Sequence, residues 1–202
     1  MTKHALLILV TLLGADNPNK WEKVEDSDRI QVWARDVPGS PIREIKAVCV
    51  IGMPAKRIWD TLADIDHYTE FMPYVEKAFI VSRFDGGHYE YQLIDPPLVD
   101  ERDYTVKVTL EVDEAAGRFK RSWAPANDKG PKKPEDVVRV EINQGYWQII
   151  AKGPDSAEVT YYLYTDPGGS IPNWIANKAN KTSVPDLMRA VRSRSVNPKW
   201  TR

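Results

Sequence analysis

The sequence contains a single cysteine, Cys49, so the chain cannot form an internal disulfide or hold a metal ion in a cluster of thiolates. The residues on both sides of Cys49 are apolar, which predicts a buried strand position. A surplus of charge of one sign is also lacking. The 202 residues have a formal net charge of −1, which gives no case for nucleic-acid binding.

Recognisable catalytic motifs are absent as well. No H-E-x-x-H, G-x-S-x-G, G-x-G-x-x-G or P-loop occurs in the sequence. The three histidines, His4, His67 and His88, have neither the spacing of metal ligands nor that of a catalytic triad. We therefore expect His67 and His88 on the surface. We also expect no catalytic residue, no metal and no cofactor.

The N-terminus differs from the rest of the chain. A short polar and basic start is followed by an apolar run over residues 5–13 and by small residues at Gly14 and Ala15. This layout predicts a secretory signal peptide over residues 1–15, ahead of one domain over residues 16–202. The protein would then be periplasmic or secreted. The alternative is an N-terminal helix of the mature fold, which would place the protein in the cytoplasm. No run of about 18 apolar residues follows, so no transmembrane helix is expected.

Most of the remaining chain has the alternation and turn signals of β-strands. Residues 54–65 and 67–74 instead have the pattern of two short helices. The strands that we predict cover residues 29–35, 43–51, 77–84, 88–94, 104–112, 118–123, 137–142, 146–151 and 157–165.

One long helix follows the strands. The turn at residues 166–169 precedes Ser170, a suitable helix cap, and Pro172, which is tolerated in a first helical turn. Apolar residues then recur at helical spacing and form one stripe. Pro185 lacks the N–H that would bond to the Lys181 carbonyl, so we predict a kink or a restart, with Ser183 as the new cap.

This order of elements predicts an α+β fold, in which a curved antiparallel sheet wraps around the C-terminal helix. A strongly twisted sheet curls, and a helix in its concave face can close it. If the helix does not fill the curl, an apolar tunnel remains, which is the usual setting for a small-molecule site.

An ordered set of short motifs resembles the StAR-related lipid-transfer (START) domains, within the helix-grip superfamily of polyketide cyclases and plant allergens. The resemblance covers about residues 21–196, and the order of the motifs is more specific than any one of them. The motifs are Trp21-Glu22, Ile30 to Ser40, Pro54 with Ile58-Trp59, Pro97 with Arg102-Asp103-Tyr104, Val137 to Arg139, Gly145 with Trp147, and Thr160 to Pro172.

The resemblance implies a helix-grip fold whose hydrophobic tunnel holds one lipid. The loop at residues 95–99 would lie at the mouth, and the C-terminal helix would act as a lid. Some family members have a basic residue in the tunnel at the position of Val108, so this chain departs from their sterol-binding chemistry. The residues that we expect to contact the ligand are Tyr91, Arg102, Trp123, Trp147, Val159, Tyr161, Leu163, Ile175, Leu187 and Met188.

The sequence leaves the roles of Arg102, of the aromatic residues and of the C-terminal basic residues open. Arg102 either meets a polar head group at the tunnel mouth or forms a structural ion pair that holds the loop. The aromatic residues Tyr91, Trp123, Trp147 and Tyr161 either pack in the core or line the ligand pocket. The basic residues near the C-terminus form either a solvated helix face or a contact with an anionic membrane. These residues are Arg189, Arg192, Arg194, Lys199 and Arg202.

The sequence therefore favours a monomeric carrier of a lipid or another apolar small molecule, with transient contact to a membrane surface and no nucleic-acid partner. A polyketide cyclase or aromatase on the same fold is the first alternative. It would need acid–base groups inside the cavity, where Tyr161 is the one proton donor that we expect. A domain that senses its ligand and reports to a partner protein is the second.

Overall fold

The protein is described by a computed structural model that covers residues 20–97, 99–169 and 171–200, without the side chains of residues 173–182. The predicted signal peptide, residues 1–15, lies outside the described residues. So do the predicted cap Ser170 and the side chain of Ile175. No helix in the described part of the chain is long and apolar enough to cross a membrane.

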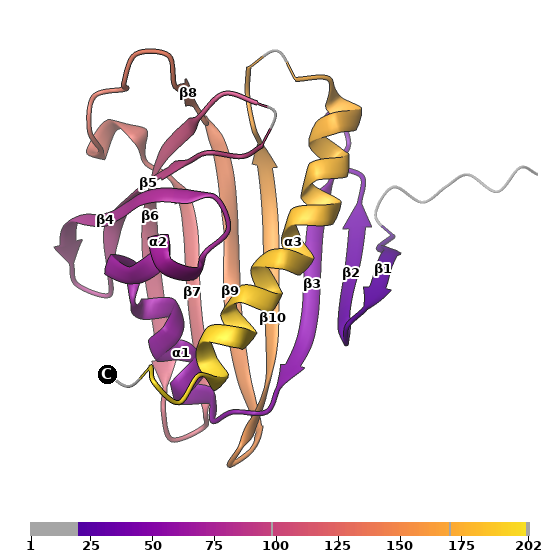
Figure 1. The fold of residues 1–202 in the computed structure, drawn as a ribbon, viewed down its shortest axis with the longest axis vertical. Coiled ribbons are helices and arrows are strands. Elements are labelled where there is room, and N and C mark those ends of the chain that lie inside the picture. Colours follow the sequence, from indigo (N-terminus) through magenta and orange to yellow (C-terminus); the bar gives the residue numbers. More distant parts are fainter. Residues whose placement is uncertain (1–19, 98, 170, 201–202) are drawn as a thin grey trace, which may run out of the picture.

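The elements follow the predicted order, with strands at both sides of the early helices and one long helix at the end (Figure 1). The strands are β1 (Glu22–Ser27), β2 (Ile30–Arg35), β3 (Glu44–Ile51), β4 (Val75–Phe84), β5 (Gly87–Ile94), β6 (Arg102–Asp113), β7 (Arg118–Pro125), β8 (Val138–Arg139), β9 (Ile142–Gly153) and β10 (Ser156–Asp166). The helices are α1 (Ala55–Ala63), η1 (Ile65–His67), α2 (Tyr68–Phe71), η2 (Asn127–Lys129) and α3 (Asn173–Val196).

The strands form one sheet of ten, in the order β1-β2-β3-β10-β9-β7-β6-β5-β4, with β8 beside β6. Neighbouring strands along this path are antiparallel, which confirms the predicted curved antiparallel sheet and the helix-grip fold. The strand predicted over residues 137–142 is wrong. Only Val138 and Arg139 form a strand, and it runs parallel to the start of β6. The next strand, β9, begins at Ile142 because its pairing with β10 extends to Asp166.

Helix α3 lies across one face of the sheet, beside α1 (Figure 1). It runs as one helix through Pro185, so the predicted restart with Ser183 as a cap is wrong. Pro185 removes one backbone hydrogen bond. Val184 and Met188, which flank it, are 2% and 1% exposed, and we attribute the continuity of the helix to their packing against the sheet.

The C-terminal half of α3 is held to its surroundings by charged groups. Arg189 and Arg192 both contact the carboxylate of Asp28, in the turn between β1 and β2. Arg194 donates to Glu70 of α2 at 2.8 Å. Three of the basic residues near the C-terminus therefore have acidic partners within the chain.

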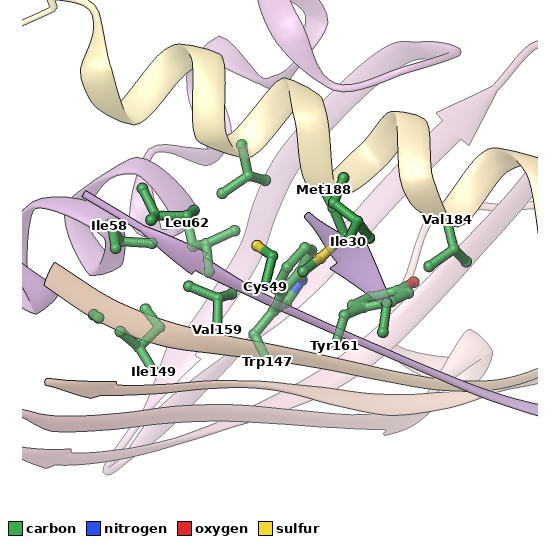
Figure 2. Packing of buried hydrophobic residues seen from close by; sticks show 14 of the residues in the cluster. Ile30, Cys49, Ile58, Leu62, Trp147, Ile149, Val159, Tyr161, Val184 and Met188 are labelled. Carbon is green, nitrogen blue, oxygen red and sulfur yellow. The ribbon is translucent and has the colours of Figure 1, made fainter. Parts of the chain in front are cut away.

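A packed apolar cluster lies beneath this half of α3 (Figure 2). Met188 and Val184 point from α3 towards the sheet, where Val159, Trp147 and other inward-facing residues of β3, β9 and β10 meet them. Helix α1 adds Ile58 and Leu62, which are both fully buried. These residues are those that the 3.6-residue period placed on the apolar face of the predicted helix 54–65. The interior is therefore solid at this end of the sheet.

The second predicted helix, over residues 67–74, is shorter than expected. It consists of η1 followed by α2, which ends at Phe71. Tyr74 has a positive φ of 64°, a conformation that ends helical geometry, and its carbonyl accepts a hydrogen bond from the amide of Asp95. This bond joins the end of α2 to the loop between β5 and β6, at the end of the sheet where the interior is not filled.

Candidate functional site

A cavity of about 650 Å³ lies beside the packed cluster, between strands β5 to β10 and the middle of α3. The β5–β6 and β10–α3 connections both reach the same end of the sheet (Figure 1) and both contribute to the lining. The apolar residues that line the cavity are Met72, Pro73, Val75, Ile94, Pro96, Pro97, Val99, Val106, Val108, Trp123, Val140, Trp147, Leu163, Pro167, Ile171, Val184 and Leu187.

The alternation of strand residues explains which side chains reach the cavity. In a β-strand, every second side chain points to the same face. The lining residues of β6 and β5 follow this period of two and leave the residues between them on the outer face. They are Arg102, Tyr104, Val106 and Val108 from β6, and Glu90, Gln92 and Ile94 from β5.

The structure brings most of the expected ligand-contacting residues to this cavity. The side chain of Ile175 lies outside the described residues, and three others are placed elsewhere. Those that line the cavity are Arg102, Trp123, Trp147, Tyr161, Leu163 and Leu187.

Tyr91, Val159 and Met188 do not line the cavity. Tyr91 lies between Glu90 and Gln92 on β5, so the alternation turns it to the opposite face, where its ring packs on Phe79. Val159 and Met188 do face the interior, but at the end where the core is solid (Figure 2). The apolar pattern predicted burial for both, but it contains no information on where packing stops and the cavity starts.

Two tryptophans of the cavity wall, Trp123 and Trp147, pack against Tyr161. The ring centroids of Trp147 and Tyr161 are 4.5 Å apart, and those of Trp123 and Tyr161 are 5.9 Å apart. Burial raises the pKa of the Tyr161 hydroxyl, so this group stays neutral. The rings therefore pack against protein partners and also line the cavity, where ligand contact remains a prediction.

Arg102 lies at the start of β6, just inside the loops. Its side chain is 2% exposed and donates a hydrogen bond to the carbonyl of Asp100, while its Nε has no hydrogen-bond partner among the described residues. The neighbouring carboxylate of Asp103 is taken by Arg139, which donates two hydrogen bonds of 2.7 Å to it. The structural ion pair of the Arg-Asp motif is therefore formed by Arg139, and Arg102 remains without a carboxylate partner in the described part of the chain.

A second charged group of the wall forms an ion pair, although Nε of Arg121 has no hydrogen-bond partner among the described residues. Arg121 of β7 donates to Glu90 of β5 at 2.6 Å and also to the hydroxyl of Tyr68 at 2.7 Å. Burial would raise the pKa of Glu90, but Arg121 and the donors from His88 and Gln92 outweigh it and hold this pKa well below its usual value. Glu90 therefore stays ionised as the acceptor of this group.

Further polar side chains continue from this pair across the wall. Gln92 donates to Glu90 at 2.6 Å and accepts a hydrogen bond from the hydroxyl of Tyr104 at 2.7 Å. Asn143 accepts from the indole N–H of Trp123 at 2.9 Å. These polar groups bond mainly to one another, and Nε of Arg121 stays without a partner among the described residues.

Sequence reasoning missed this polar part of the site. Glu90, Gln92 and Arg121 share a strand face with apolar residues, and the alternation could have flagged them as inward-facing. The predicted surface position of His88 is wrong for the same reason. His88 is 4% exposed and shares its face with Glu90, to which its Nε2 lies at 3.1 Å. His67, in contrast, is 46% exposed, as expected.

The described residues contain no group of three or more histidine, cysteine, aspartate or glutamate side chains that could hold a metal ion. The chemistry that the site offers is instead one of shape and charge. It combines an apolar volume, a polar wall whose Glu90 and Arg121 pair with each other, and one buried cation without an ion pair at the inner side of the mouth loops.

Comparison with known proteins places this geometry in a family. The rat phosphatidylcholine transfer protein is 27% identical over an alignment of 185 residues, which covers 88% of this chain and 83% of that protein. Mouse START domain-containing protein 10 is 28% identical over 199 residues, covering 89% of this chain, and the chain spans 63% of that relative's length.

Among solved structures, the STAR-related lipid transfer protein from Xanthomonas axonopodis superposes with a TM-score of 0.79 at 27% identity, covering 88% of this chain and 99% of that one. The family model described as "Polyketide cyclase / dehydrase and lipid transport" matches residues 51–192. This match spans more than half of the chain and includes every residue that lines the cavity. The chain belongs to this family, with the START form of its fold.

Proposed function

We propose that this protein binds one lipid in the cavity beneath α3 and carries it between membranes. The observation that supports this most directly is the cavity of about 650 Å³ with a predominantly apolar lining. Relatives named for phosphatidylcholine transfer and for STAR-related lipid transfer add support. Burying about 400–600 Å² of apolar lipid surface favours binding by about 10–15 kcal/mol before entropic costs.

The binding energy matches what a carrier needs. It is comparable to the energy that holds a lipid in a bilayer, so exchange between protein and membrane can be close to neutral. The loops at the open end provide a membrane contact, since prolines 73, 96 and 97 lie there and Tyr74 is 41% exposed. The arginines of α3 support such a contact less, because Asp28 and Glu70 already pair with them.

A cyclase or aromatase activity has less support. The buried carboxylate of the wall, Glu90, accepts hydrogen bonds from Arg121 and Gln92 and lies beside His88. A group in this setting is a poor general acid, because its proton is lost well below neutral pH, and a poor base, because its lone pairs are in use. The cavity wall therefore favours holding a ligand over transforming it.

The proposal is tested by native mass spectrometry of the purified protein and by a fluorescent-lipid transfer assay between vesicles. We expect a co-purified lipid at one per chain and a transfer rate that increases with protein concentration. An empty protein that accelerates no transfer, although it is folded by circular dichroism, would rule out carriage.

The opening of α3 as a lid is tested by fixing its C-terminal half to α1. The hydroxyl oxygens of Thr61 in α1 and Ser195 in α3 are 3.2 Å apart, so we select these two positions for cysteines and check by mass spectrometry that the disulfide forms. We propose that the lid opens by movement of α3 on the mouth side of Pro185, while the other half stays anchored. The oxidised double variant should then transfer lipid at the wild-type rate. A rate that falls on oxidation and recovers on reduction would show that the whole helix must move.

A further inference from the structure

The charge of the cavity lining restricts the ligand. Among the described lining residues, the charged side chains are Glu90, Arg102 and Arg121. Glu90 and Arg121 neutralise each other across 2.6 Å. Arg102 is left with no ion pair within the described residues, so the cavity carries a formal charge of +1.

Burying an unpaired cation is costly, and proteins usually pair such a group or leave it in water. Arg102 makes no ion pair within the described residues: it is 2% exposed, Asp103 is committed to Arg139, and the Asp100 carboxylate acts on it only through a longer-range electrostatic interaction. An anionic group on the ligand would supply the missing partner. The guanidinium presents a fork of N–H donors that suits a carboxylate or a phosphate.

The volume restricts the ligand in a second way. Pockets of about 300–1,000 Å³ enclose ligands of drug-like size, and this cavity lies in the middle of that range. One long alkyl chain with a small head fits such a volume, whereas the second chain of a diacyl lipid would remain outside.

We propose that the cavity selects a single-chain lipid with an anionic head, either a carboxylate or a monoacyl phosphate. The head binds Arg102 inside the mouth loops, and the tail extends between the apolar face of β6, at Val106 and Val108, and Leu187 of α3. This proposal rests on the proposed function, because it specifies the lipid that the same cavity carries.

The test compares four probes by isothermal titration and native mass spectrometry, each single-chain probe below its micelle concentration. The probes are oleate, oleyl alcohol, monooleoyl phosphatidate and dioleoyl phosphatidylcholine in vesicles. We expect oleate or monooleoyl phosphatidate to bind one per chain, about tenfold or more tighter than oleyl alcohol, because a hydrogen bond to a charged group is replaced by a neutral one. The tighter of the two anions identifies the head group.

Two substitutions of Arg102 link the preference to this residue. R102M should remove the advantage of the anion over oleyl alcohol, and R102K, which keeps the charge, should retain most of it. R192M is the matched control, since Arg192 lies outside the cavity and pairs with Asp28; its preference should equal that of the wild type. Thermal unfolding of each variant shows whether it is folded.

The outcomes separate this inference from the proposed function. If neither oleate nor monooleoyl phosphatidate binds tighter than oleyl alcohol, or if the diacyl lipid binds one-to-one in preference to both anions, the single-chain anionic ligand is overturned and lipid carriage still stands. Failure of all four probes to bind the folded protein would overturn the proposed function itself.

Discussion

The pairing of Glu90 with Arg121 predicts an inversion of the pH dependence of stability in R121M. Both side chains are buried, at 1% and 6% exposure, and Oε2 lies 2.6 Å from Nη2. Removing Arg121 leaves the Glu90 carboxylate in the cavity wall without its cation, which typically destabilises a protein by about 3–5 kcal/mol. For a domain whose total stability is about 5–15 kcal/mol, this loss is large but leaves a folded protein within reach of measurement.

The sign of the pH effect differs between the two proteins. In the wild type, the pKa of Glu90 is held below the ordinary value of 4.5, so its contribution is present above that pH and is lost as the pH falls. In R121M, burial is no longer outweighed and raises this pKa above the unfolded value. The folded variant then binds more protons than the unfolded chain, and its stability falls as the pH rises.

Urea unfolding followed by tryptophan fluorescence, at pH values between about 3.5 and 7, measures both slopes. The double variant E90Q/R121M should recover most of the loss, because neither charge remains buried. K23M, which removes an exposed pair with Asp26, is the control and should change little. Parallel pH profiles for the wild type and R121M would refute the reasoning, since they would mean that Glu90 is not coupled to Arg121.

Other substitutions test the packing and the second buried pair. D103N should lower the free energy of unfolding by about 3 kcal/mol, because the largely buried Arg139 loses its bidentate partner; thermal and urea unfolding measure this. M188A should cost about 2–5 kcal/mol in the same assay, since Met188 is 1% exposed in the solid core, whereas L187A at the cavity should cost less and weaken lipid binding. Cys49, whose pKa burial raises to about 11, should resist iodoacetamide in the native protein and react after unfolding.

Periodicity alone predicted the architecture, because each element has a face that must be buried. Burial alternates along strand β2, and helix α1 has one apolar stripe. Such patterns are the same whichever element covers the buried face, so they can be recognised in the sequence alone. The errors occur where a long-range contact decides the local structure. β8 forms only as a short parallel partner for β6, and α3 continues through Pro185 while its neighbours pack on the sheet.

The site could be predicted only in part, for a related reason. The sequence pattern indicates which side chains are buried, and the resemblance to START domains added Arg102, Trp147 and Tyr161 as expected ligand contacts. It does not indicate how inward-facing residues are divided between a solid core and a void, so Met188 was assigned to the wrong one. That division depends on how far α3 lies from each strand, which no local pattern encodes.

The polar residues of the wall show why this division matters for function. In a fully packed core, the pair of Glu90 and Arg121 would add no stability over an apolar pair of similar volume, which is often as stable. Beside a cavity, the same pair provides a wall that water or a lipid head can approach without leaving a charge unpaired. Arg102 differs from them in one respect, because its counter-charge is missing from the described chain. If the protein is a carrier, the ligand itself completes the electrostatics of the interior, and the empty form should be the less stable one by an amount that depends on ligand concentration.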